Sequence, residues 1–388
     1  MGVRRFLGHY KRLIKRAYRY FQEFRPDIWV AEGALHNEKD IIPVSILCAT
    51  RKDQRAHILK QLIGTSYREH SVGKAWLWNI SKVAESTKCC ASFVQVRPEF
   101  RKLVERGQWL LLPKWIDTEI DIPLPPSILR NQSVKTDLRN IQKNSLTYDV
   151  IYDVTKNKEY FDDFYYNMYV PYIKKRHEDS AFIMSIDAMR ENTKGGDLLR
   201  VIKNGVPIAG QLIEYHDTGP ECKEMGIRDG NKEFVRQGAI GALFHFSFQY
   251  LSEKGYVKLG YGGSSPFFNN GSFRYKRKLG MKITGTKDVT FSMNILNNGQ
   301  STRAFLRQNP MIIKKDEKPC GLVFLDECAS LQDENKLIKL YNKYYVEGLK
   351  LLIVIPSGAF SDVLKIPYEL SNKIQICNAS SVFGWKAV

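Results

Sequence analysis

The sequence predicts an α/β protein of two or three domains. Short β-favouring runs alternate with helical patterns between residues 43 and 112. Two apolar runs flank Asn204-Gly205, a dipeptide typical of two-residue β-hairpin turns. The tail after residue 320 has a β-α-β-β order, which indicates a small parallel sheet. A chain of 388 residues, 43% of them hydrophobic, is long enough to bury more than one core.

The first part of the chain divides at prolines. We expect a basic amphipathic helix within residues 1–30, then a first α/β unit over 40–126 that ends at Pro123 to Pro126. Hydrophobic patterning in this unit predicts helices and strands in alternation. The strands are expected at 43–49, 76–80, 93–96 and 110–112, and the helices at 51–64 and 99–106.

A second unit is expected over 127–317, followed by a small α/β segment over 318–388. Strands in the second unit are predicted at 148–153, 197–203, 206–215, 222–227, 256–259 and 282–293. Helices are predicted at 133–143, 158–175 and 236–254. In the tail we expect strands at 322–325, 351–355 and 373–376 and a helix at 334–345. No motif in the tail indicates a function.

The charge balance favours anionic partners. The formal net charge is +18 and the pI is about 9.4, which suits nucleic acid, a phosphorylated carrier, coenzyme A or an acidic membrane surface. The predicted N-terminal helix places aromatic and aliphatic residues at helical spacing with cations between them, so it could contact an acidic membrane or RNA. Such a helix more often packs its apolar stripe on the protein body, and both interpretations stay open.

The cysteines indicate a reducing compartment. Seven cysteines are scattered without a Cys-x-x-Cys pair, and the histidines do not stand at ligand spacing with them. We therefore expect no metal site and a cytoplasmic protein. The first 26 residues hold no uninterrupted apolar run, unlike a secretory signal, and no apolar run in the chain is long enough to span a bilayer.

The segment from Gly260 to Gly280 concentrates the features of a binding site. Glycines, a proline and two asparagines predict a turn-rich loop that runs into aromatic residues and four cations. A glycine-rich backbone lets a ligand approach closely and leaves N–H groups available to an anion. A surface hairpin with solvated charges has the same local composition, so that interpretation also stays open. The four cations are Arg274, Lys276, Arg277 and Lys278.

One run within this segment resembles a family motif. The run Gly271-Ser272-Phe273-Arg274-Tyr275-Lys276-Arg277-Lys278-Leu279-Gly280 is similar to the Gly-x-x-(Arg)-aromatic-Lys-x-x-aliphatic-Gly pattern of Fem-type (FemABX) peptidyltransferases, which are relatives of the GNAT acyltransferases. The resemblance covers roughly residues 43–290. It implies two tandem GNAT-like halves with mixed central sheets, of which the first is degenerate and the second catalytic, and it places the family's lysine on Lys276.

The resemblance also implies a donor site. GNAT enzymes bind the coenzyme A pyrophosphate with an Arg/Gln-x-x-Gly-x-Gly/Ala turn at a helix N-terminus. The matching residues are Arg236, Gln237, Gly238, Ala239 and Gly241, with Ala239 in place of one glycine. Fem-type enzymes use an aminoacyl-tRNA, so the donor stays open between acyl-CoA and aminoacyl-tRNA. The residues that we expect to bind substrate are Arg139, Lys143, His177, Gly263, Ser264 and Tyr275.

The reaction that follows from the resemblance is N-acyl transfer, in which an amine of a small molecule or peptide attacks an activated carbonyl. Lys276 would stabilise the developing oxyanion. The amine must lose a proton, and Glu214 is the candidate base, with His245 or a water as alternatives. Two other interpretations stay open: an aminoacyl-tRNA-dependent peptidyltransferase, and a non-catalytic module that binds RNA or a membrane.

Overall fold

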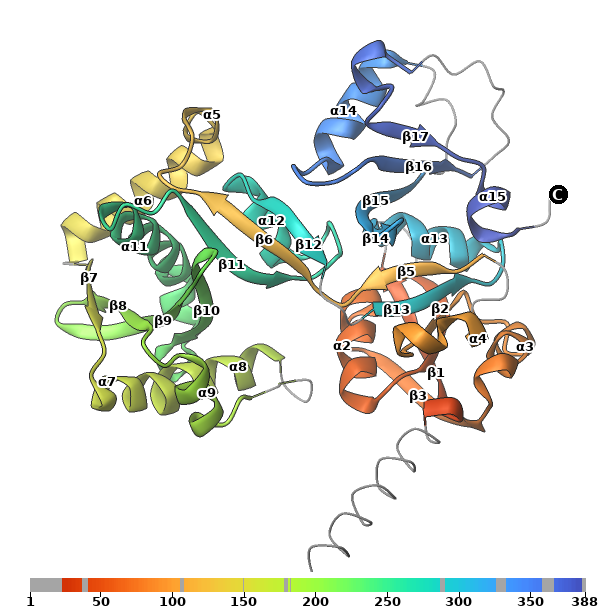
Figure 1. Ribbon diagram of the computed structural model, residues 1–388, viewed down its shortest axis with the longest axis horizontal. Coiled ribbons are helices and arrows are strands. Elements are labelled where there is room, and N and C mark those ends of the chain that lie inside the picture. Colours follow the sequence, from red (N-terminus) through yellow and green to blue (C-terminus); the bar gives the residue numbers. More distant parts are fainter. Residues whose placement is uncertain are drawn as a thin grey trace, which may run out of the picture.

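The chain folds around two mixed β-sheets, which confirms the predicted α/β class (Figure 1). The computed structural model describes residues 23–36, 41–104, 108–148, 150–177, 181, 183–286, 290–325, 333–357 and 366–385. Most of the predicted N-terminal helix lies outside these ranges. None of the helices within them is both long and apolar enough to cross a membrane.

The larger sheet takes its ten strands from both ends of the chain. Its core combines side chains of the first unit, such as Ile46 and Phe93, with side chains of the tail, such as Ile355. The tail has the predicted β-α-β order. Its strands do not form a separate sheet, because they continue the sheet of the first unit. In spatial order the strands are β17 (Ile374–Ile376), β16 (Leu352–Pro356), β15 (Lys318–Leu325), β14 (Met311–Lys315), β5 (Leu110–Pro113), β13 (Thr290–Ile295), β4 (Ala91–Val94), β2 (Ile41–Ala49), β1 (Asp27–His36) and β3 (Tyr67–Lys74).

The smaller sheet has seven strands and carries the segment that resembles the family motif. Its hairpin turns at Asn204 and Gly205, whose φ angles of 50° and 77° are those that an Asn-Gly turn requires. Its order is β12 (Lys282–Thr286), β6 (Ile116–Asp121), β11 (Lys258–Ser264), β10 (Gly219–Ile227), β9 (Val206–His216), β8 (Asp197–Lys203) and β7 (Val150–Thr155).

Helices cover both faces of the smaller sheet, because neighbouring residues of a strand point to opposite sides. Leu199 of β8 packs with α11, whereas Leu198 packs with the π-helical segment η3 (Phe164–Tyr169) and with α9. Figure 1 shows α11 on one side of β8 to β10 and the helices α7 to α9 on the other. The helices of this unit are α5 (Pro126–Leu129), α6 (Gln132–Tyr148), α7 (Lys158–Asp163), α8 (Val170–His177), α9 (Ile186–Asn192), α10 (Lys232–Arg236), α11 (Ala239–Glu253) and α12 (Gly271–Lys278).

The remaining helices pack on the larger sheet or lie beside its edges. They are α2 (Lys52–Ile63), α3 (Ile80–Ser86), α4 (Arg101–Val104), α13 (Gln300–Gln308), α14 (Glu334–Tyr344) and α15 (Ala379–Phe383). The predicted strand at 76–80 is wrong: residues 77–79 form a 3₁₀ turn that leads into α3. Leu77 and Ile80 are both buried three residues apart while Trp78 is exposed, which is a helical period.

Two further predictions along the second unit are corrected. The predicted loop over 260–280 contains a helix, α12, because the Asn270 side chain accepts a hydrogen bond from the Phe273 N–H and caps it. The predicted strand over 282–293 is two strands, β12 and β13, which belong to different sheets. The predicted helix over 236–254 is interrupted at Gly238, where α10 has ended and α11 has not begun.

Candidate functional site

The site is built on a β-α-β unit made of β10, α11 and β11. The two strands are parallel, and their register holds one residue pair, Glu221 with Gly260. Toward their carboxyl ends, β10 continues beside β9 and β11 beside β6, so the two strands no longer pair with each other. The N-terminus of α11 follows β10 at this end. Its first N–H groups lack partners within the helix, as at any helix start, and the helix dipole is positive there.

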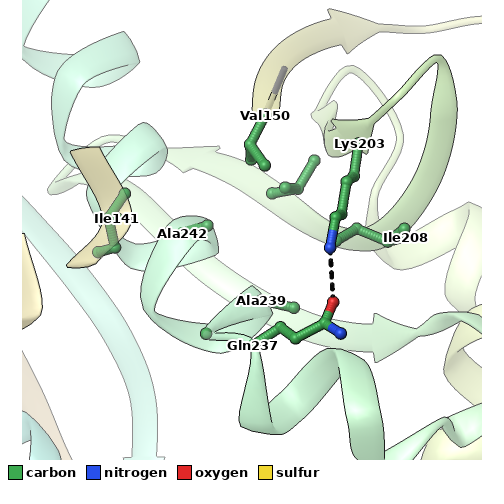
Figure 2. Close-up of a pocket in the computed structure, with 9 residues that line it drawn as sticks. Ile141, Val150, Lys203, Ile208, Gln237, Ala239 and Ala242 are labelled. Carbon is green, nitrogen blue, oxygen red and sulfur yellow. Dashed lines mark hydrogen bonds between the residues drawn. The ribbon is translucent and has the colours of Figure 1, made fainter. Parts of the chain in front are cut away.

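The predicted donor turn forms the start of α11. Gly238 is the N-cap residue and has a left-handed φ of 91°, which explains a glycine at this position. Arg236 is exposed and pairs with Glu233 at 3.4 Å. The Gln237 amide oxygen accepts a hydrogen bond from the Lys203 ammonium at 2.7 Å, so the end of β8 holds the turn (Figure 2).

A small cavity lies beneath this turn, as Figure 2 shows. Its volume is about 20 Å³, room for one water-sized molecule. A nucleotide does not fit it, so a phosphate-bearing donor would approach the turn from outside the cavity. Its walls are mainly apolar, from Ile141, Val150, Val201, Ile208, Ala239 and Ala242.

Gly241, in the first turn of α11, faces α6 and α12. A Cβ atom at Gly241 would lie 3.4 Å from Ile141 of α6 and 3.6 Å from the Tyr275 hydroxyl of α12. Tyr275 also meets the Phe244 ring edge-on at 5.0 Å, and burial raises the pKa of its hydroxyl. The structure thus brings Tyr275 to Gly241, in the same turn of α11 that begins at Gly238 and Ala239.

Lys276 is buried at the carboxyl end of β11. Its side chain is only 5% exposed, and its ammonium donates to the Tyr261 carbonyl and, at 2.9 Å, to the Ser264 hydroxyl. The Tyr261 ring stacks on Phe244 of α11 at 3.9 Å, so α11, β11 and α12 meet around this ammonium. A buried charge is stable only with such partners. Lys276 and Ser264, predicted separately, are therefore in direct contact.

The first unit also reaches this end of β11, which the sequence did not indicate. A Cβ atom at Gly263 would lie 3.2 Å from Trp115, so a side chain there would crowd the indole. The Trp115 ring lies 4.8 Å from that of His57 on α2. The Asn270 amide, at the start of α12, donates a hydrogen bond to the Gln61 side chain of α2 at 2.7 Å. Helix α2 thus borders the carboxyl end of β11.

Glu214, the predicted base, lies away from this end. It stands opposite Glu221 in the β9–β10 register, where β10 and β11 are still paired, and it contacts His216 at 3.3 Å and Lys223 at 3.7 Å. The structure does not bring it to Lys276.

Glu224, which the sequence did not indicate as a candidate, lies nearer to the end of β10. It falls at a register shift between Cys222 and Met225, and burial, with the Glu214 charge second, raises the pKa of its carboxyl. Two residues on, a Cβ at Gly226 would lie 2.5 Å from the backbone of Met168, so the π-helical segment η3 packs directly against this strand end. Perturbed carboxyls and π-helical segments both concentrate at functional sites.

The other predicted residues lie apart from Lys276. Arg139 and Lys143 are exposed on α6, whose Ile141 faces α11. His177 ends α8, and its side chain is outside the described residues. His245 is partly buried within α11, and burial lowers the pKa of its imidazole. In the described ranges, no three His, Cys, Asp or Glu side chains are grouped as metal ligands would be.

Comparisons with known proteins give distant likenesses. No protein-family model matches the sequence, and no curated protein matches it. The structure of L-PGS from Bacillus licheniformis is 13% identical, with a TM-score of 0.35 over 70% of this chain and 87% of that chain. The GCN5-related N-acetyltransferase from Sphaerobacter thermophilus is 10% identical, with a TM-score of 0.33 over 68% of this chain and 75% of that one. At these TM-scores, both below 0.5, the likenesses do not establish a function.

A buried hydrogen-bond network lies behind Lys276 and was also missed. The Tyr261 hydroxyl donates to the Gln211 amide oxygen at 3.0 Å, and the Ser247 hydroxyl donates to the same oxygen at 3.1 Å. Burial raises the pKa of the neighbouring Cys222 thiol to about 12, and the Lys276 charge acts in the opposite direction. The positive charge of Lys276 therefore acts on this buried thiol. Patterning could not reveal this network, because its members come from three elements far apart in the sequence.

Proposed function

We propose that this chain is an N-acyltransferase of the GNAT/Fem-like type, which transfers an acyl group from an activated ester or thioester to an amine. The observation that carries the proposal is the buried Lys276 ammonium, which α12 places at the end of β11. The same helix contacts the first turn of α11 through Tyr275. A fixed cation and a free helix N-terminus at one end of a β-α-β unit suit a substrate that bears phosphate and a reacting carbonyl.

The proposed chemistry has one bond forming and one breaking. The amine nitrogen attacks the carbonyl carbon, negative charge develops on the carbonyl oxygen, and collapse expels the thiolate or alkoxide of the donor. Lys276 would stabilise the carbonyl oxygen through its charge. Removal of one group that stabilises such an oxyanion commonly lowers the rate about 10²–10³-fold. We propose Glu224, in place of Glu214, as the group that accepts the amine proton, because a raised pKa makes its carboxylate a better base.

Two donors are compatible with this proposal. Acyl-CoA fits the turn at Gly238, where the helix N-terminus would face a pyrophosphate. Aminoacyl-tRNA is favoured by the net charge of +18 and by the exposed cations Arg139 and Lys143 on α6, which lies beside α11. A tRNA donor predicts a steep fall of affinity with salt, whereas a flat response would leave acyl-CoA.

The experiment is native mass spectrometry of the protein purified from cells, followed by a transfer assay with labelled acetyl-CoA or aminoacyl-tRNA and a set of amines. We expect Lys276→Ala to lower transfer about 10²–10³-fold. Arg274, exposed on the same helix, gives the matched control Arg274→Ala, which should stay within about twofold. Unchanged transfer by a folded Lys276→Ala protein would remove this site from the chemistry. If no donor is consumed while RNA binds tightly, the chain is a binding module.

A further inference from the structure

We propose that a second cavity, on the α9 side of the smaller sheet, binds a small organic anion that carries a short apolar chain. The cavity lies between the end of β7, the start of α7, α9 and the start of β8. Asp197 at its wall and Lys203, which holds the donor turn, are the two ends of β8, about 20 Å apart. The proposal therefore concerns a separate site and does not depend on acyl transfer.

The size of the cavity limits the ligand to a small molecule. Its volume is about 240 Å³, whereas sites for drug-sized ligands have about 300–1,000 Å³. Coenzyme A is larger than such ligands, so this cavity is not a second donor site. It is far larger than the 20 Å³ cavity beneath the donor turn, so it has room for more than one water.

One part of the wall is apolar. Leu198 and Leu212 stand opposite each other in the β8–β9 register, and they are 3% and 2% exposed. The Phe161 side chain of α7 lines the cavity beside them. An apolar chain that lies on these side chains leaves water, and each buried methylene tightens binding about fourfold.

The carboxylate on the wall is already satisfied by the protein. Asp197 is 3% exposed, and its Oδ2 atom accepts hydrogen bonds from the Tyr215 and Tyr250 hydroxyls, both at 2.6 Å. The same oxygen accepts from the Lys254 ammonium at 3.1 Å, and Oδ1 lies 3.5 Å from the Lys156 ammonium. A ligand that brings a cation or a hydroxyl would therefore gain little from this carboxylate.

Two lysines of the β7–α7 connection make the polar part of the wall positive. The Lys156 side chain is 65% exposed, and its ammonium donates to the Gly195 carbonyl at 3.3 Å. Its charge is not cancelled, because Asp197 is shared with Lys254. Lys158 is exposed and lines the same cavity.

The third cation at the cavity serves the fold. Arg190 of α9 pairs with Asp162 of α7 and lies 3.7 Å from Asp187. Its guanidinium is also 5.9 Å from the centre of the Phe161 ring. Arg190 therefore fixes α9 against α7 and shapes the cavity, while Lys156 and Lys158 remain to attract an anion.

These two parts of the wall select the ligand together. An inorganic anion would use the lysines and leave the apolar part in contact with water, and a neutral apolar molecule would do the reverse. A carboxylate or a phosphate monoester on a short alkyl chain uses both. The anionic head with its apolar chain is the chemistry that we propose, and the first test below distinguishes the two heads.

The first test is isothermal titration calorimetry of the full chain with a matched series of ligands. We expect hexanoate to bind with a Kd of about 1 mM, as burial of its five methyl and methylene groups suggests. Acetate should bind more than about 100-fold more weakly, because it lacks four methylenes. Hexanol should bind about tenfold more weakly than hexanoate, and hexylammonium more weakly still. Hexyl phosphate replaces the carboxylate head, and the tighter of the two anions identifies the head that the lysines prefer.

The second test locates the site. The double change Lys156→Gln and Lys158→Gln should weaken hexanoate about tenfold, to the level of hexanol. Its matched control, Lys336→Gln with Lys339→Gln, alters two exposed lysines of α14 and should bind as the parent does. Lys158→Glu alone should also weaken hexanoate, and it should fold well because a negative charge is favourable at the first position of α7. Absence of hexanoate binding overturns the proposal, as do equal affinities for hexanoate and hexanol or equal losses in the two double variants.

Discussion

Replacing Lys276 by alanine should lower the free energy of unfolding by about 3–5 kcal/mol. The ammonium donates to the Tyr261 carbonyl and the Ser264 hydroxyl, and a hydrogen bond to a charged group contributes about 1.5–3 kcal/mol. Loss of the buried aliphatic stem adds about 1–2 kcal/mol, while release of the ammonium from its desolvated position offsets part of the sum. Lys276→Met keeps most of the stem, so its loss should be smaller, about 2–3 kcal/mol.

The assay is urea unfolding of Lys276→Ala beside Arg274→Ala, which alters an exposed cation two residues away and should change stability by less than about 0.5 kcal/mol. A double-mutant cycle with Ser264→Ala should give a coupling of about 1–2 kcal/mol, because the two groups are in contact. If Lys276→Ala lowers the free energy of unfolding by less than about 1 kcal/mol, or shows no coupling to Ser264, the buried contacts of the Lys276 ammonium do not stabilise the fold as proposed.

Four other substitutions test the surrounding geometry. Gly238→Ala should cost about 1–2 kcal/mol in urea unfolding, because its φ of 91° disfavours a side chain. Gly226→Ala places a Cβ 2.5 Å from backbone of η3 and should cost roughly 1–3 kcal/mol, with a lower Tm. Burial raises the folded-state pKa of Glu224, so the contribution of this carboxyl to stability declines as pH rises through that pKa. Glu224→Gln should therefore be more stable than the parent near pH 7, and the difference should vanish near about pH 4. Urea unfolding at the two pH values measures this difference. Gly241→Ala meets only ordinary van der Waals contacts, so it should keep or raise Tm, and calorimetry should show weaker donor binding if the glycine serves the ligand.

Local signals in the sequence were enough for most elements. The hairpin at Asn204-Gly205 and helix α2 were predicted correctly, because turn chemistry and helical periodicity act within a few residues. Helix α12 was missed because glycine, proline and asparagine dominate the residues before it. The useful signal was Asn270 as a cap, with Phe273 and Lys276 three residues apart on one buried face.

Sheet membership and the site itself depend on non-local pairing. Nothing within residues 116–121 shows that β6 lies between β11 and β12, nor that β13 leaves the second unit for the larger sheet. A lysine is rarely buried, so composition favours a solvated Lys276. Its burial follows from acceptors that β11 supplies, which patterning does not reveal.

The separation of β10 and β11 gives the two faces of the smaller sheet different parts in the proposed reaction. Lys276 approaches the end of β11 from the side of α11, beside the Tyr261 ring. Glu224 belongs to the end of β10. Burial, with the Glu224 charge second, raises the pKa of Tyr169, which lies in η3 on the other face. At the paired residues Glu221 and Gly260, the hydrogen-bonded backbone of β10 and β11 separates the two faces of the sheet. Beyond that pair, a carbonyl held between the two strand ends would have the cation on one side and the base, with the amine, on the other. Glu214 stands level with the paired residues, whereas Glu224 lies beyond them, so Glu224 is the better placed of the two carboxyls for this part.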